Sequence, residues 1–174
     1  MTPRVRWAIF LLGAWAAGSV AVTVVATQNF YTIDRLLADS PSQSFRELTG
    51  QLEASHARTF LRYLSSELNR LYFRRWNEAQ LVLGVATFWI LTGNPAAARA
   101  RWGVLAMLVV VVAMTVWLAP AITTLGRTID FVPRNPPPPE LARFGVLHAA
   151  YSSLEIAKLL AGLGLAFILS RADR

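Results

Sequence analysis

Long apolar stretches dominate this chain and limit what it can fold into. Hydrophobic residues make up 55% of the 174 positions and charged residues only 16%, whereas a soluble domain has about 25% charged residues. The apolar residues are gathered into runs close to the roughly 20 residues that a helix needs to cross a bilayer. We therefore expect a single integral membrane domain over residues 1–174. The predicted fold class is an all-α membrane protein with four transmembrane helices in an antiparallel bundle.

The four predicted spans lie at about residues 7–27, 76–91, 102–119 and 144–169. The first run has an alternative interpretation as a signal peptide, because Arg4 and Arg6 precede it and it contains small residues of the kind found at cleavage sites. Its apolar run is longer than the core of a typical signal peptide, which favours a retained helix. Pro120 ends the third run, at a point where a helix can kink or stop.

The distribution of positive charge predicts how the chain is oriented. The net charge is +7, and it comes from arginine, since Lys158 is the only lysine. Short arginine-bearing segments lie on the cytoplasmic side of a membrane, and such segments occur at both termini and between residues 93 and 101. We predict that both termini are cytoplasmic and that residues 28–75 and 126–143 lie on the outer side. Membrane lipids are the expected partners of the basic groups, and nucleic acid is not, because no basic run is interleaved with aromatic residues.

Two segments outside the spans have recognisable patterns. In residues 28–75, the first helix is predicted to run past the membrane up to a break at residues 40–42. Apolar residues then recur at three- and four-residue steps, which predicts one amphipathic helix of roughly 25 residues that can continue into the second span. Its mixed charges favour packing against the first helix as a hairpin; the alternatives are the bilayer surface or a partner. The proline-rich loop 129–140 predicts a stiff connector, with binding to a partner's groove as the alternative.

The fourth span carries a stripe of polar residues inside an apolar run. Its members are His148, Tyr151, Ser152, Glu155 and Lys158. On a helix, His148, Ser152 and Glu155 share one face, and Lys158 is three residues beyond Glu155 and can pair with it. Ionisable groups at bilayer depth are costly and usually face a protein interior.

We expect this stripe to form an interhelical packing seam, with Asn77 and Gln80 of the second span among its hydrogen-bond partners. Gln28 and Asn29 are further candidates. Two functional alternatives stay open. One is a path for protons or a small solute that uses His148 and Glu155, and the other is a pocket for a ligand or a lipid.

The sequence predicts neither a catalytic residue nor a metal site. The chain has no cysteine, and its two histidines, His56 and His148, lie on different predicted elements without the spacing of metal ligands. It also has no glycine-rich phosphate loop and no nucleophile motif. No cofactor is predicted, although His148 could serve as the single axial ligand of a haem or a chlorophyll.

The order of these features resembles a family of small four-helix membrane proteins of unknown function found in bacteria and eukaryotes. Its best-known eukaryotic member is a human transmembrane protein associated with drug resistance. The resemblance lies in the small residues Gly13–Gly18 of the first span, in LAPAITTLGR after the third, and in FGVLHAAYSSLEIAKLLAGL in the fourth. It implies that His148, Ser152 and Glu155 are shared polar positions, although this chain has a charged Glu155 where an amide is expected. It also implies a bacterial inner membrane location.

We therefore expect a non-enzymatic integral membrane protein, most simply an accessory or structural subunit that packs against other integral membrane proteins in a larger complex. Small size, the lack of a catalytic motif and the outer amphipathic helix favour this function. The alternative is a small transporter or a component of a proton or solute path that uses the stripe of His148, Ser152 and Glu155. Against that alternative, the chain shows no internal repeat of the kind found in many transporters.

Overall fold

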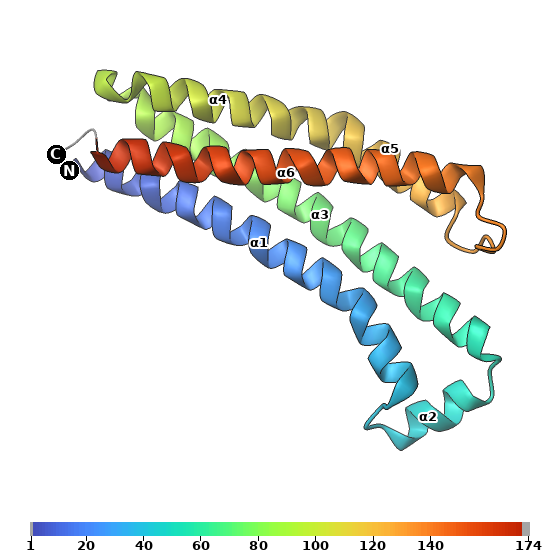
Figure 1. Cartoon of the computed structure of the whole chain (residues 1–174). Coiled ribbons are helices and arrows are strands. Elements are labelled where there is room, and N and C mark those ends of the chain that lie inside the picture. The colour runs from blue at the N-terminus through green and yellow to red at the C-terminus, as the bar shows by residue number, and fades with distance from the viewer. Residues whose placement is uncertain (1, 172–174) are drawn as a thin grey trace.

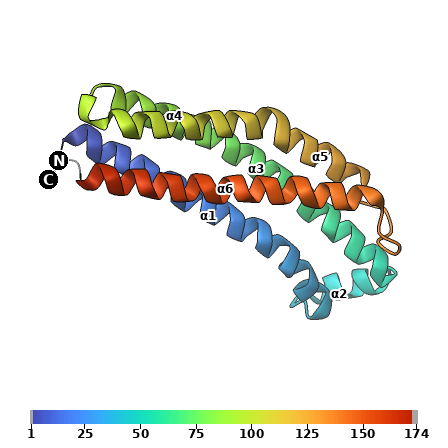
Figure 2. The ribbon, with the colours of Figure 1, turned by 45° about the horizontal axis from the view of Figure 1, so that its top comes forward.

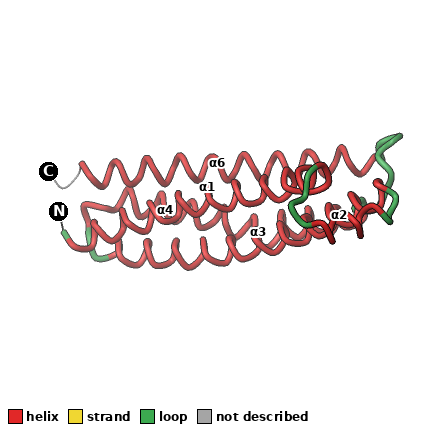
Figure 3. Tube along the Cα trace, turned by 90° about the horizontal axis from the view of Figure 1, so that it is seen from below, coloured by secondary structure: helices red, strands yellow, loops and turns green. Residues whose placement is uncertain are grey.

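The computed structural model describes residues 2–171, which are helical apart from short connections. The elements in chain order are α1 (Pro3–Ala38), α2 (Gln43–Gly50), α3 (Ala54–Thr92), the 3₁₀ turn η1 (Pro95–Ala97), α4 (Ala98–Ala113), the π-helical turn η2 (Met114–Leu118), α5 (Ala119–Thr128) and α6 (Pro139–Arg171). No strand occurs in this described part of the chain. Figure 3 shows that loops occur chiefly where the chain reverses direction.

Three helical segments are long and apolar enough to cross a membrane: Pro3–Ala38, Ala98–Thr128 and Pro139–Arg171. They contain the first, third and fourth predicted spans. α3, which contains the second predicted span, is long but does not meet the same criterion. The reason is visible in its sequence, because the polar residues Asn77, Glu78 and Gln80 precede the apolar part and leave it short.

α1 is a single helix that extends well past the first predicted span. The Thr2 hydroxyl accepts a hydrogen bond from the Val5 backbone N–H at 3.4 Å and caps its first turn, and Pro3 occupies the first helical position, where its missing N–H costs nothing. The helix ends at Ala38, immediately before the predicted break at residues 40–42.

The prediction of one amphipathic helix after that break is wrong, because the helix is divided into α2 and the start of α3. α2 ends at Gly50, a residue that disfavours helix. The backbone N–H of Gln51 then donates a hydrogen bond to the Leu48 carbonyl, which closes a turn. α3 begins at Ala54 and then continues without interruption to Thr92. The outer helical section and the second predicted span therefore form one continuous helix.

The third predicted span differs from expectation at its end. Pro120 neither stops the helix nor breaks it, since α5 continues to Thr128. Instead, the turn before the proline widens into the π-helix η2, in which the Ala119 N–H bonds the Met114 carbonyl. Proline cannot donate a backbone hydrogen bond, and π turns accommodate such defects and often occur at functional sites.

α6 begins within the proline run. Pro139, the last of the four consecutive prolines, is its first residue, and Glu140 lies in its first turn, where a carboxylate is favourable for the helix dipole. The predicted loop 129–140 therefore overlaps the helix by two residues.

α1, α3, the continuous segment α4–α5 and α6 lie side by side near the end that holds the termini, and the chain reverses direction between α3 and α4 and between α5 and α6 (Figures 1 and 2). α1 packs against α3 and α6, and α4 packs against the same two helices. Both chain ends lie at the same end of the molecule as η1. At the opposite end, the last part of α1, α2 and the first part of α3 diverge from α5 and α6, as Figure 1 shows. We call the segment from residue 28 to residue 72 the projecting hairpin.

The core is apolar at the end that holds the termini and becomes polar at the middle. An apolar cluster there includes Leu12, Leu91 and Val104, all fully buried. Nearer the middle, α1 and α3 approach closely at Gly18. A Cβ atom at that position would lie 2.0 Å from Cη2 of Trp76, so the glycine makes room for the indole ring.

Candidate functional site

A group of hydrogen-bonded polar side chains lies in the middle of the helices, and we call it the polar cluster. Its members come from α1 (Trp15, Ser19), α3 (Trp76, Asn77, Gln80) and α6 (Tyr151, Glu155, Lys158). Three helices therefore contribute donors and acceptors to one connected set. Most of its side chains are buried.

An ion pair lies at the centre of the polar cluster. The Lys158 ammonium donates to Glu155 Oε1 at 2.8 Å and to Gln80 Oε1 at 2.6 Å. The Lys158 side chain is 3% exposed and that of Glu155 is 14% exposed. Gln80 Nε2 in turn donates to Glu155 Oε1 at 3.2 Å, so one amide contacts both charges. This arrangement neutralises the two charges locally, which a buried ion requires.

α1 contributes two further donors from one face. The Trp15 indole N–H donates to Gln80 Oε1 at 2.9 Å, and one turn later the Ser19 hydroxyl donates to Glu155 Oε2 at 3.2 Å. Ser19 also accepts a hydrogen bond from the Trp76 indole N–H at 3.3 Å. Each oxygen of the Glu155 carboxylate therefore accepts from at least one neighbouring helix.

The polar cluster ends at Asn77 and Tyr151. Tyr151 donates its phenolic hydrogen to Asn77 Oδ1 at 2.8 Å, and Gln80 Nε2 lies 3.3 Å from the same oxygen. The Tyr151 ring packs edge-on against Phe73, with ring centroids 5.5 Å apart. Across residues 2–171, the one buried side-chain polar atom without a hydrogen-bond partner is Asp130 Oδ2, which is outside the polar cluster.

The structure brings together five of the seven predicted site residues, namely Asn77, Gln80, Tyr151, Glu155 and Lys158. The other two differ from prediction. His148 is exposed, and its ring stacks on Phe144 with centroids 5.9 Å apart. Ser152 is half-buried and is not one of the hydrogen-bonded residues of the cluster. For His148 the physical reason is that α1 and α3 diverge from α6 towards the end where α6 starts, so its ring lies at an open cavity.

The other two predicted hydrogen-bond partners, Gln28 and Asn29, do not join the polar cluster. Gln28 is exposed. The Asn29 side chain donates to Asn69 Oδ1 at 2.6 Å, which links α1 to α3 within the projecting hairpin. Trp15 and Ser19 are not among the predicted site residues, although their four-residue spacing places an indole N–H and a hydroxyl on one face of an otherwise apolar helix.

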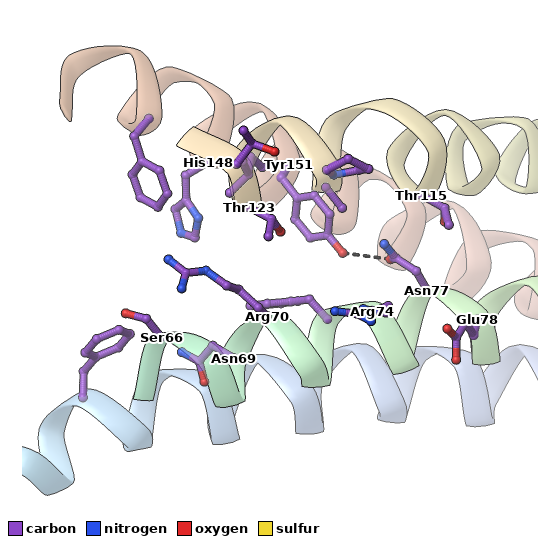
Figure 4. A pocket seen from close by; sticks show the side chains of 17 residues that line it. Ser66, Asn69, Arg70, Arg74, Asn77, Glu78, Thr115, Thr123, His148 and Tyr151 are labelled. Carbon is purple, nitrogen blue, oxygen red and sulfur yellow. Dashed lines mark hydrogen bonds between the residues drawn. The ribbon is translucent and has the colours of Figure 1, made fainter. Parts of the chain in front are cut away.

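A cavity of about 580 Å³ opens beside the polar cluster, between α3, α5 and α6 (Figure 4). Its walls include apolar side chains such as Phe73, Ile122 and Phe144. Figure 4 shows that Arg70 projects into this space from α3 and His148 from α6, with the hydrogen bond from Tyr151 to Asn77 at its inner side. The cavity therefore extends from exposed residues to members of the polar cluster.

Arg70, which lines this cavity, belongs to an ionic group. Arg70 donates to Glu67 at 2.6 Å and to Asp130 at 2.9 Å, and Arg127 forms two hydrogen bonds of 3.1 Å to the Glu67 carboxylate. These contacts tie α3 to the end of α5 and the loop that follows it. The hydrogen bond from Arg127, supported by Arg70, holds the pKa of the Glu67 carboxyl below its ordinary value, against the effect of partial burial.

The described residues contain no group of three or more histidine, cysteine, aspartate or glutamate side chains that could hold a metal ion. His56 lies near the start of α3, beside Glu53 and away from His148. His148, at the cavity, is the residue that could serve as a single axial ligand to a haem or chlorophyll, and that prediction stays untested. No protein-family model, curated protein or solved structure matches this chain. The resemblance to a small four-helix membrane protein family therefore also stays a prediction.

Proposed function

We propose that the chain is a four-span membrane protein in which α1, α3, α4–α5 and α6 form an antiparallel bundle with both termini in the cytoplasm. Three of these segments are apolar enough to cross a membrane. α3 can cross with them because two polar residues of its predicted span, Asn77 and Gln80, are 1% and 0% exposed and hydrogen-bonded to neighbouring helices. A buried polar residue of this kind costs less than the same residue facing lipid. Glu78, which is exposed between Asn77 and Gln80, is paired with Arg75.

The arginine distribution supports this orientation. The α3–α4 turn and the first residues of α4, which include Arg99, lie at the same end as both termini (Figure 1). Arg4 near the N-terminus donates to the carbonyl of Gly93 in that turn at 3.1 Å. The arginines of the opposite end are interspersed with carboxylates, and several of them, such as Arg58 and Arg70, form ion pairs. Positive charge therefore outweighs negative charge at the end that holds the termini, as expected for a cytoplasmic face.

We further propose that the protein is a non-enzymatic accessory subunit that packs against another integral membrane protein. The observation that carries this proposal is the projecting hairpin, which leaves large apolar side chains exposed. Leu48, Phe60 and Leu64 are 64%, 61% and 55% exposed there, outside the predicted spans. Exposed apolar side chains gathered on one element are typical of surfaces that contact a partner. The polar cluster, by contrast, has its hydrogen-bonding groups occupied by one another.

A site-specific crosslinking experiment tests the accessory-subunit function. A photoreactive residue in place of Phe60 should give one discrete crosslinked product with another membrane protein in native membranes. The same residue in place of Arg99, exposed at the opposite end, is the matched control and should not give that product. A pair of substitutions, Phe60→Ser and Leu64→Ser, should abolish co-purification in mild detergent while leaving the helix content unchanged. Co-purification that survives both substitutions would contradict the proposal.

A second function is favoured by the continuity between the cavity and the polar cluster. Asn77 and Tyr151 belong to both, and Glu155 lies one hydrogen-bonded residue further, through Gln80. A proton or a small solute could follow this route. Purified protein in liposomes tests it: flux that Glu155→Gln abolishes and Leu160→Met preserves would favour the path over the accessory function. Leu160 is on the same helix and is 64% exposed.

A further inference from the structure

The cavity between α3, α5 and α6 combines two kinds of wall. Six of its lining residues have apolar side chains: Phe30, Phe73, Ala119, Pro120, Ile122 and Phe144. Hydroxyl and amide groups are added by Ser66, Asn69, Thr115, Thr123 and Thr124. Apolar walls with a few polar groups are typical of sites for small amphiphilic molecules, and the volume of about 580 Å³ is within the usual range for such sites.

The charges around this cavity do not cancel. Arg70 is held by Glu67 and Asp130, and Glu78 is paired with Arg75 at 2.8 Å. Arg74 also lines the cavity and is exposed. Among residues 2–171, no carboxylate forms an ion pair with the Arg74 guanidinium. One positive charge is therefore left over beside an apolar cavity, and this charge would attract an anionic group.

The position of the cavity relative to the helices says which anion suits it. Its inner side reaches Asn77 and Tyr151, which are buried, whereas its rim is formed by exposed residues such as Arg74 and His148. In the proposed membrane bundle, that rim lies at the outer end of the spans, where lipid headgroups are found. A soluble anion would not need the apolar walls, and an uncharged lipid would leave the Arg74 charge without a partner.

We propose that this cavity is a binding site for an anionic phospholipid, with the phosphate of the headgroup at Arg74 and the upper part of the acyl chains against Phe73 and Ile122. The volume holds the headgroup region and the first part of the chains, so the remainder of the lipid stays in the bilayer. Hydroxyls such as that of Thr123 are placed to donate to headgroup oxygens. The inference rests on the proposed membrane bundle but not on the proposed partner.

Native mass spectrometry of the purified full chain tests this site. The protein is released from micelles doped with phosphatidylglycerol, with diacylglycerol, which has no phosphate, or with inorganic phosphate, and the bound fraction is measured for each. We expect phosphatidylglycerol to be retained at least tenfold better than diacylglycerol, the effect of losing about one hydrogen bond to a charged group. Inorganic phosphate alone should not be retained. Equal retention of the two lipids, or binding of free phosphate as strong as that of the lipid, would overturn the proposal.

Three variants locate the binding site. Arg74→Gln should reduce phosphatidylglycerol retention about tenfold, and Thr123→Trp, which fills the cavity, should reduce it for both lipids. Arg99→Gln removes the same charge at the opposite end and should leave retention unchanged. An equal loss in Arg99→Gln and Arg74→Gln would show non-specific attraction and overturn the proposal, as would full retention in Thr123→Trp. Circular dichroism establishes that each variant keeps its helix content. Failure of lipid retention would contradict this binding site, but it would not change the outcome of the crosslinking test at Phe60.

Discussion

The ion pair between Lys158 and Glu155 allows a sharp test of how the bundle is held together. Lys158→Met removes the ammonium but keeps an unbranched side chain. The Glu155 carboxylate, whose side chain is 14% exposed in the native protein, then has no counter-charge. Breaking a buried pair from one side costs about 3–5 kcal/mol. Glu155 still accepts hydrogen bonds from Ser19 and Gln80, both at 3.2 Å. We therefore expect the lower end of that range, about 3 kcal/mol of lost stability.

Glu155→Gln should cost a similar amount, because it leaves Lys158, 3% exposed, with the amide oxygen of Gln80 as its acceptor. The double variant Glu155→Gln and Lys158→Met removes both charges at once. Replacing a buried ion pair by neutral groups is often close to neutral, so the double variant should lose only about 1 kcal/mol, far less than the sum of the two single losses.

Unfolding by sodium dodecyl sulfate in mixed micelles, followed by circular dichroism, gives the free energies for this comparison. Leu160→Met introduces the same methionine on the outer face of the same helix and should change stability by less than about 0.5 kcal/mol. The stabilising role of the ion pair is refuted if Lys158→Met lowers stability as little as this control does. It is also refuted if the double variant is destabilised by the full sum of the single variants, since the two charges would then be independent.

Two further predictions concern helix contact and pH. Gly18→Ala places a Cβ 2.0 Å from the Trp76 ring and should lower the free energy of unfolding by about 1–3 kcal/mol in the same assay. In the control Gly13→Ala, the new Cβ has no neighbouring atom within 4 Å, so the free energy of unfolding should not fall. Equal effects of the two substitutions would contradict the close contact. The Glu67 carboxyl has a folded-state pKa below its ordinary value of 4.5, so its contact with Arg127 stabilises the fold above that pH and is lost as the pH falls through the lower folded-state pKa. The protection factors of α5, which correct for the intrinsic pH dependence of exchange, should fall in the native chain as the pH drops below 4.5, and Glu67→Gln should show the lower protection already at neutral pH. A profile unaffected by this substitution would refute the role of Glu67.

The helical class and the candidate spans follow from the apolar runs, because run length is a local property. The division of the outer helix could not be predicted from periodicity alone. The apolar spacing passes through Gly50 without interruption, and only the backbone cost of the glycine and the turn after it separates α2 from α3. Likewise, the effect of Pro120 depends on whether the preceding turn can widen, which the sequence does not show.

The polar cluster could be predicted only on the helix where its residues are closely spaced. Glu155 and Lys158 are one turn apart, so their pairing is local. The bonds from Lys158 to Gln80 and from Trp15 to Gln80 join residues that are far apart in the chain, and they depend on how each helix is rotated. α1 is apolar on nearly all sides, so its pattern does not indicate which face meets α3. Spacing puts His148 on the same face of α6 as Glu155, but it does not show that His148 is exposed where the helices diverge.

The central claim is that four helical segments cross the membrane with both termini on the cytoplasmic side. Because the chain has no cysteine, single cysteines can be introduced and labelled in intact cells with a membrane-impermeant maleimide. Gln51→Cys and Arg134→Cys should label in intact cells, whereas Arg99→Cys and Arg171→Cys should label only after the membrane is permeabilised. If Arg99→Cys instead labels in intact cells together with Gln51→Cys, then α3 does not cross the membrane and the four-span bundle is wrong.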